Sequence, residues 1–193
     1  MSDAPLVGLF VGGQGTRMGG VAKGLLRLAS GQNVIERLLG ELARALPNSE
    51  RVLVGAATAY AALELEALAD RPAGVGPIGG LAALLEHAAA RGAGQALALA
   101  CDLPRLDAGI IARLAAADAA ASAVVICQGG VRNPLIARYA VEPSHAAVAA
   151  ALGAGQRSLQ AVLDRLQPPP TLLELAPADA ALLDDWDAPS DMR

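Results

Sequence analysis

The chain has 193 residues, of which 54% are hydrophobic and 18% charged, so it can bury a sizeable core and is not intrinsically disordered. Its formal net charge of −4 and its aromatic content of 2% argue against a nucleic-acid partner, because neither a basic surface nor a base-stacking platform can be assembled. Its longest charge-free stretches fall short of the roughly 18 residues of a membrane span, and its start lacks the basic residues of a secretory signal, so we expect a cytoplasmic protein that enters no membrane.

Short apolar runs alternate with amphipathic segments along the chain. The apolar runs predict buried β-strands at residues 6–11, 51–55, 95–101, 123–127, 135–139 and, after three prolines, 171–176. Leucine, isoleucine and valine at helical spacing predict helices over residues 33–46, 58–69, 81–90 and 108–121. Two further helices are expected on either side of Ala154, and Asp107 is expected to cap the helix that follows it. This alternation predicts the α/β class: a single three-layer α/β/α domain over residues 1–193 with a mainly parallel, Rossmann-like sheet.

Ligands of such sheets bind at the carboxyl ends of the strands, so the loops there are expected to carry function. The first of these loops, residues 12–26, reads GGQGTRMGGVAKGLL. Clustered glycines let backbone N–H groups approach an anion, and Arg17 and Lys23 add the positive charge that a polyphosphate requires. Lys23 is also the only lysine among the 15 basic residues. The alternative interpretation is a flexible, solvated turn.

Two better-known phosphate loops do not fit this segment. A Walker A loop needs glycine before its lysine and serine or threonine after it, whereas Lys23 follows Ala22 and precedes Gly24. A dinucleotide-binding loop needs the spacing G-x-G-x-x-G and a carboxylate after the second strand, and this chain has neither. A phosphate site here therefore belongs to a different type.

Two carboxylates lie in the later loops. Asp102 ends an apolar strand in the segment ALACDLPRL, where a buried carboxylate needs a partner such as Mg²⁺ bridging phosphate oxygens; the alternative is a turn-forming aspartate ahead of proline. Asp70 is the first residue of the segment DRPAGVGPIGGL, in which a helix is expected to start near Gly79. The alternative to a role in a ligand pocket is that this segment is a turn and Asp70 a surface carboxylate. Cys101 and Cys127 each close an apolar run and are expected to be core thiols.

These loops resemble the motifs of the molybdenum cofactor guanylyltransferases, a family of nucleotidyltransferases. The family patterns are GGxxxRMGGxxKxLL, DxxxGxGPLxGL and CDxP, and the resemblance continues through RNPL, GQRSL and DWDAPSD to cover residues 6–191. It implies a fold of the nucleotide-diphospho-sugar transferase type, in which the N-terminal half binds the nucleotide and the C-terminal half binds the acceptor.

The resemblance implies that GMP is transferred from GTP to the phosphate of molybdenum-bound molybdopterin, with release of pyrophosphate and with Mg²⁺ as cofactor. It also implies transient contact with proteins that mature molybdoenzymes. A phosphate nucleophile is already ionised near neutral pH and needs no general base, which agrees with a structural reading of His87 and His145.

Roles are carried over by position in the motifs. The resemblance assigns catalysis to Arg17, Lys23 and Asp102. It assigns nucleotide contacts to Phe10, Val11, Gly12, Gly13, Lys23, Asp70, Gly76, Gly80 and Asp102. It assigns metal binding to Asp102 and Asp187, and acceptor binding to Arg132 and Arg157. The alternative interpretation of Asp187 is that it belongs to a frayed acidic tail. The alternative interpretation of Arg132 and Arg157 is that they are ordinary surface residues.

The departures from the family pattern bear on the choice of substrate. Ala22 stands where the guanylyltransferases usually have aspartate, Gly55 stands where they usually have asparagine, and the DWD ending is nearer that of the cytidylyltransferase relatives. The RMGG string favours guanine. The alternatives are therefore a CTP-dependent molybdopterin cytidylyltransferase, a sugar-phosphate nucleotidyltransferase of the same fold and, from a different class, a non-catalytic nucleotide-binding sensor or cofactor chaperone.

Overall fold

The computed structural model describes residues 4–12 and 22–183, which form a sheet covered by helices on both faces. The seven strands of the sheet have the order β3-β2-β1-β4-β6-β5-β7. Their bounds are β1 (Leu6–Phe10), β2 (Arg51–Val54), β3 (Ala67–Leu68), β4 (Gln95–Ala100), β5 (Ala123–Gln128), β6 (Val131–Ala140) and β7 (Thr171–Glu174). β6 pairs antiparallel with β4 and β5, and the other neighbours pair in parallel. The expectation of a mainly parallel sheet is confirmed.

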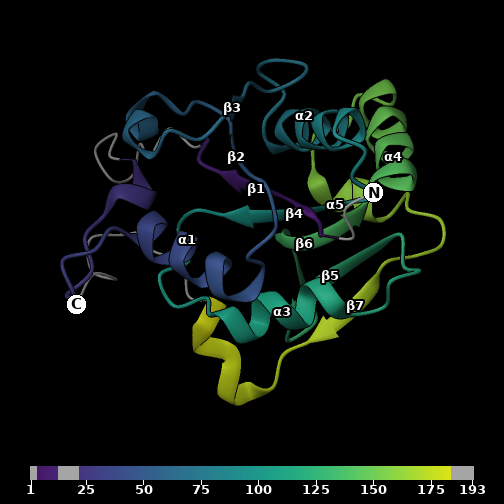
Figure 1. The fold of residues 1–193 in the computed structure, drawn as a ribbon. Coiled ribbons are helices and arrows are strands. Elements are labelled where there is room, and N and C mark those ends of the chain that lie inside the picture. The colour runs from purple at the N-terminus through teal and green to yellow at the C-terminus, as the bar shows by residue number, and fades with distance from the viewer. Residues whose placement is uncertain (1–3, 13–21, 184–193) are drawn as a thin grey trace.

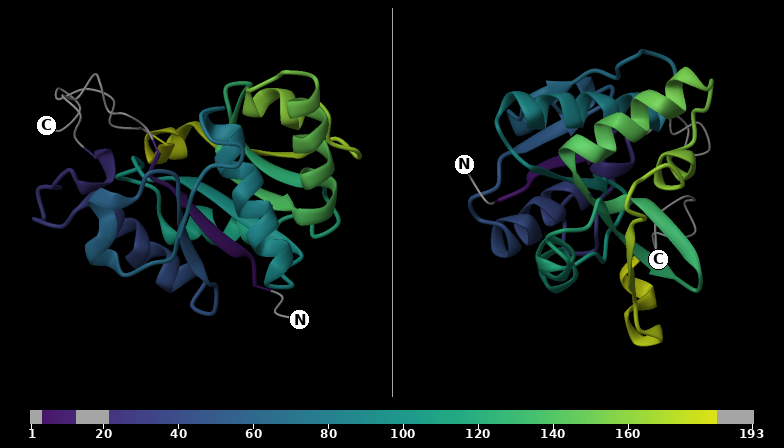
Figure 2. Two further views of the ribbon diagram at one scale, coloured as in Figure 1. Left: turned by 90° about the horizontal axis from the view of Figure 1, so that it is seen from above. Right: turned by 90° about the vertical axis from the view of Figure 1, so that its right-hand side faces the viewer.

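The helices divide between the two faces of the sheet. They are α1 (Val34–Ala45), α2 (Pro77–Ala90), α3 (Ala108–Ala116), α4 (Val141–Gly153) and α5 (Leu159–Leu163), with shorter 3-10 turns η2 (Lys23–Leu25), η3 (Thr58–Leu63) and η4 (Pro177–Leu183). Figure 1 shows α2 and α4 above the sheet and α1 and α3 below it, and the turned views of Figure 2 keep the sheet between them. None of the described helices is long and apolar enough to cross a bilayer.

The core follows from the alternation of side chains along each strand. Successive strand residues point to opposite faces, so Leu6 of β1 joins the cluster under α2 and α4, while Val7 joins the cluster under α1 and α3. Asp107 caps α3 as expected, since its Oδ1 accepts a hydrogen bond of 2.9 Å from the backbone N–H of Ile110. The three-layer α/β/α architecture expected from the sequence is confirmed.

The helix expected over residues 58–69 is wrong. This segment forms the short turn η3, reverses at Glu64, whose φ is 52°, and then adds β3 to the edge of the sheet. Backbone N–H groups of Leu53 and Gly55 donate to the carbonyls of Glu66 and Leu68. The alanine and leucine content favours a helix locally, but pairing with the free edge of β2 satisfies the backbone instead.

Candidate active site

Four neighbouring parallel strands end at one edge of the sheet, and predicted site residues follow three of them, β1, β3 and β4. β1, β2, β3 and β4 run in the same direction, so the segments after Phe10, Val54, Leu68 and Ala100 meet at this edge. In open α/β sheets this edge is where ligands bind.

An ion pair joins two of the predicted residues at this edge. Nζ of Lys23 donates a hydrogen bond of 3.0 Å to Oδ2 of Asp102, across 79 positions of sequence. Lys23 begins the turn η2, and Asp102 follows β4. The two side chains are 25% and 18% exposed, so the pair is partly shielded from solvent and still reachable by a ligand. The fold thus brings together the residues to which the sequence assigns phosphate and metal.

The hydroxyl group of Tyr60 lies beneath this pair. It accepts a hydrogen bond of 3.2 Å from the backbone N–H of Gly24 and lies 3.8 Å from Sγ of Cys101. Burial raises the pKa of Tyr60, with a further contribution from Cys101, so the hydroxyl remains protonated. Burial, followed by the charge of Asp102, raises the pKa of the Cys101 thiol to about 11. Both expected core thiols, Cys101 and Cys127, are buried and free of disulfides.

Asp70 lies on the other side of the edge, beside the first turn of α2. A methyl group placed on Gly80 would lie 3.3 Å from Oδ1 of Asp70 and 2.9 Å from the ring of Phe10, so these three predicted residues are neighbours. Burial raises the pKa of Asp70 above its ordinary value. Gly76 precedes the first residue of α2, so the N-terminus of this helix points toward the same region.

The ends of β1 and β2 come unusually close at two glycines. A Cβ atom on Gly55, whose φ is 102°, would lie 2.8 Å from Cα and 2.9 Å from the backbone nitrogen of Gly12. Only glycine fits such a contact, because the obstacle is backbone and cannot turn away. The departure at Gly55 from the family's usual asparagine therefore has a packing cause in this chain.

Two cavities meet at Asp102. One, of about 140 Å³, is lined by Phe10, Val11, Gly12, Lys23, Ala100, Cys101, Asp102 and Leu135. The other, of about 280 Å³, is lined by Ala100, Asp102, Leu103, Asn133, Pro134, Leu135, Ile136, Leu159 and Leu183. We name them the phosphate cavity and the second groove. Because Asp102 lines both, ligands in the two spaces would face each other across its carboxylate.

The arginines predicted for the acceptor lie close in sequence to residues that line the second groove. Arg132 donates to Oδ1 of Asp164 at 2.7 Å, and its carbonyl accepts from the side chain of Gln160. Arg157 is exposed and lies just before α5, whose first residue, Leu159, lines the groove. Arg17, Gly13 and Asp187 lie outside the described residues.

Candidate metal ligands occur in two parts of the described chain. Asp102 offers a carboxylate at a strand end beside space for phosphates, which is how Mg²⁺ is commonly held, with few protein ligands and several waters. Elsewhere, Glu50, Glu66 and His87 have ligand atoms within 4.8 Å of one another.

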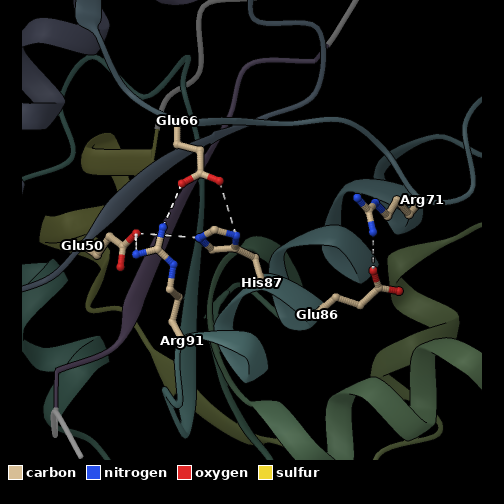
Figure 3. Close-up of polar contacts among 6 residues, drawn as sticks. All are labelled: Glu50, Glu66, Arg71, Glu86, His87 and Arg91. Atoms are coloured by element: carbon tan, nitrogen blue, oxygen red, sulfur yellow. Dashed lines mark hydrogen bonds and ion pairs between the residues drawn. The ribbon is translucent and has the colours of Figure 1, made fainter.

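The second of these groups is already paired with an arginine. Figure 3 shows Arg91 between the two glutamates, with guanidinium nitrogens 3.2 Å from Glu50 and 3.0 Å from Glu66. Both glutamates precede the amino ends of their strands, whereas Asp102 follows the carboxyl end of β4. A cavity of about 420 Å³ between β3 and α2 also lies beside His87 rather than beside Asp102. Asp102 and this cluster are each paired with a basic side chain, and they differ in place: Asp102 lies beside the phosphate cavity at the carboxyl end of β4.

The family match shows the class of protein: it is a nucleotidyltransferase, and its mainly parallel sheet agrees with that class. Residues 8–170 match the MobA-like NTP transferase domain, and the chain belongs to that family. A relative from Shewanella sp. (strain MR-4), a molybdenum cofactor guanylyltransferase, is 30% identical over 156 residues, which are 78% of this chain and 76% of the relative.

Solved structures share the fold at lower identity. The molybdopterin-guanine dinucleotide biosynthesis protein A from Archaeoglobus fulgidus is 23% identical, with a TM-score of 0.74 over 96% of this chain and 94% of that chain. The 2-C-methyl-D-erythritol 4-phosphate cytidylyltransferase from Thermus thermophilus is 18% identical, with a TM-score of 0.65 over 96% and 94%. The family assignment from the sequence is confirmed, and these two likenesses support the fold alone.

The sequence interpretation missed Tyr60 and, in the second groove, Ile136 and Leu183, whereas Pro134, Leu135 and Leu159 fall in the RNPL and GQRSL segments of the resemblance. Tyr60 is one of only two tyrosines in the chain, and a rare aromatic residue in an alanine-rich segment was an available signal. Leu183 could not have been found in this way, because its place in the groove depends on how η4 packs back onto the sheet.

Proposed function

We propose that this protein transfers GMP from GTP to the phosphate of molybdenum-bound molybdopterin and releases pyrophosphate. The observation that carries the proposal is the ion pair of Lys23 and Asp102 at the junction of two cavities, in a chain of this family. The relative's printed name, molybdenum cofactor guanylyltransferase, supports the choice of substrates.

The nucleotide would lie along the edge formed by β1, β2 and α2. Lys23, together with Arg17, would neutralise the triphosphate beside the phosphate cavity, where its ammonium already faces a carboxylate at 3.0 Å. Asp70 and the buried first turn of α2 around Gly80 would contact the base, because a carboxylate accepts hydrogen bonds from the donor edge of guanine.

Mg²⁺ is the proposed cofactor, with Asp102 as its ligand and Asp187 as a second one. When bound, the ion would neutralise negative charge on the phosphate oxygens during transfer. Asp102 would hold the ion, and the ammonium of Lys23 would contact the phosphates. The ion pair is therefore a resting arrangement in which each charge satisfies the other until substrate arrives.

The acceptor would occupy the second groove. Six of its nine lining residues are leucine, isoleucine or proline: Leu103, Pro134, Leu135, Ile136, Leu159 and Leu183. Such a lining favours a flat heterocycle over a sugar, whose hydroxyls each need a hydrogen-bond partner when buried. Arg132 and Arg157 would hold the acceptor's phosphate.

In the transfer step, an oxygen of the acceptor phosphate attacks the α-phosphorus of GTP in line with the leaving group. A new P–O bond forms, the bond between the α-phosphorus and its bridging oxygen breaks, and pyrophosphate carries away the electron pair. The nucleophile is already ionised, so this chain's residues supply position and charge rather than a base. We expect the reaction to run in the cytoplasm, and transient contact with molybdoenzyme maturation proteins stays a prediction.

Substitution of the ion pair tests the proposal. Asp102→Ala is expected to lower the rate of pyrophosphate release from GTP and molybdopterin by about 10²–10³-fold, because the carboxylate that would hold Mg²⁺ at the phosphates is removed. Lys23→Ala is expected to raise KM for GTP about tenfold or more, through loss of a charge-assisted contact. Asp179→Ala, at a surface carboxylate paired with Arg113, is the matched control and should match the wild type.

Comparison of nucleotides separates the remaining candidates. GTP, CTP and ATP are offered in turn with Mg²⁺, and the rise in melting temperature and the release of pyrophosphate are measured. We expect the largest effects with GTP. Preference for CTP would indicate the cytidylyltransferase alternative, and binding of GTP without pyrophosphate release in the presence of molybdopterin would indicate a non-catalytic sensor. Wild-type rates in both ion-pair variants would refute the site.

A further inference from the structure

We propose that the hydroxyl group of Tyr60 is a positioning group that fixes Lys23 relative to Asp102. The inference rests on the roles proposed above for Lys23 and Asp102. Tyr60 itself touches neither substrate: it is 2% exposed and lies in the core cluster under the site.

The first contact of Tyr60 holds the segment that carries the lysine. The backbone N–H of Gly24, next to Lys23, donates to the hydroxyl at 3.2 Å, and this hydrogen bond is buried. Gly24 packs so closely on the ring that a Cβ atom there would lie 3.1 Å from both Cε1 and the hydroxyl oxygen of Tyr60. The turn η2 therefore rests directly on this tyrosine.

The second contact reaches the segment that carries the carboxylate. Sγ of Cys101, next to Asp102, lies 3.8 Å from the same hydroxyl oxygen. Because the oxygen already accepts from Gly24, its own hydrogen is available to the sulfur. The backbone N–H of Cys101 in turn donates to the carbonyl of Phe10, which ties this segment to β1.

One hydroxyl thus binds the immediate neighbours of both members of the ion pair. Removing it would take away the hydroxyl that accepts from the buried N–H of Gly24 and would let η2 move relative to the end of β4. Displacements of about 1 Å can cost about 100-fold in rate when charges must meet reacting phosphates. We therefore assign Tyr60 to positioning rather than to contact with substrate.

The test compares Tyr60→Phe with the wild type, alone and in the Lys23→Ala background. Tyr60→Phe keeps the ring and is expected to lower kcat/KM for GTP about tenfold, with a higher KM and a lower kcat, since both charges are displaced. In the Lys23→Ala background the same change is expected to cost less than it does in the wild type, because one of the two charges through which it acts is already missing.

Ser144→Ala is the control for loss of a buried hydroxyl. Ser144 is fully buried, and its hydroxyl donates to the carbonyl of Ser122 ahead of β5, far along the chain from the ion pair. Its kcat and KM should match the wild type even if its melting temperature falls. If Tyr60→Phe does not fold, Gly24→Ala displaces the same turn from the other side and should give the same kinetic losses.

The results separate this inference from the proposed function. Two results would overturn the positioning role while the ion-pair variants remain impaired. One is that Tyr60→Phe lowers kcat/KM by the same factor in the wild-type and Lys23→Ala backgrounds, and the other is that Tyr60→Phe has wild-type kinetics. Wild-type kinetics of the ion-pair variants themselves would instead overturn the proposed function.

Discussion

Asp70 is a residue of the candidate site whose charged form the fold disfavours. Its carboxylate is partly buried beside the first turn of α2, and this burial raises its pKa. The folded state therefore holds the proton more tightly than the unfolded chain does. It follows that ionised Asp70 destabilises the fold, and that this cost appears as the pH rises through the ordinary aspartate range near about 3.9.

Asp70→Asn tests this cost and the role of the residue together. At pH 7 the variant should melt at a higher temperature than the wild type, and near pH 3 the two should melt alike, because Asp70 is then protonated. Binding of Mg²⁺ and GTP, measured by calorimetry at pH 7, should weaken through loss of the proposed contact with the base. An equal difference in melting temperature at both pH values would contradict the assigned burial cost, and Asp179→Asn serves as the surface control.

At the scale of elements, the glycine contact between β1 and β2 is a constraint that the family pattern does not predict. Asparagine is usual at the position of Gly55, yet here a Cβ atom would meet the backbone of Gly12. We expect Gly55→Asn to lower the free energy of unfolding by about 1–3 kcal/mol through overpacking, and to weaken GTP binding by displacing the loop after β1.

A second glycine gives the matched control for this substitution. Gly92 also has a positive φ, 69°, but no atom lies within 4 Å of a Cβ added there. Gly92→Asn should therefore bind GTP like the wild type. Normal melting and normal GTP binding of Gly55→Asn would show that the two strand ends do not approach in this way.

Glu41 joins the two helices on the lower face of the sheet. It is 7% exposed, pairs with Arg37 and Arg44 of its own helix, and accepts a hydrogen bond of 3.0 Å from the backbone N–H of Ala108 at the start of α3. Glu41→Ala should cost about 1–3 kcal/mol of unfolding free energy, because it leaves a shielded donor unpaired, and should leave GTP binding unchanged. Chemical denaturation measures the free energy of unfolding, and the exposed Glu142→Ala is the control. A loss within the range of about 0.5 kcal/mol that ordinary surface substitutions cause would contradict the role of Glu41.

Across the whole molecule, most strands were predictable from apolar runs, whereas β3, the first residues of β6 and the order of the strands in the sheet were not. Apolar runs ending at glycine or aspartate located β1 and β4 within a residue, because burial on both faces demands continuous apolar sequence. Residues 58–69 failed because the free edge of β2, set by the rest of the chain, outweighed local helix preference.

At the candidate site, the sequence predicted residues that the fold brings to one edge of the sheet, but not their contacts. The loops named Lys23, Asp70 and Asp102, since charge at strand ends needs a ligand to explain it. Their pairing across 79 residues, the hydroxyl of Tyr60 beneath them and the apolar second groove required the fold. Spacing along the chain carries no information on such contacts.

In the proposed reaction, the α-phosphorus of GTP passes to the phosphate of an acceptor, and this transfer depends on Asp102. The most direct measurement follows GTP labelled at its α-phosphorus, mixed with Mg²⁺, molybdenum-bound molybdopterin and either the wild type or Asp102→Ala. We predict that the wild type moves the label into an acceptor-linked product in equal amount with released pyrophosphate, and that Asp102→Ala moves almost none. Label that stays in GTP, or that appears as free GMP with the acceptor unmodified, would contradict the account.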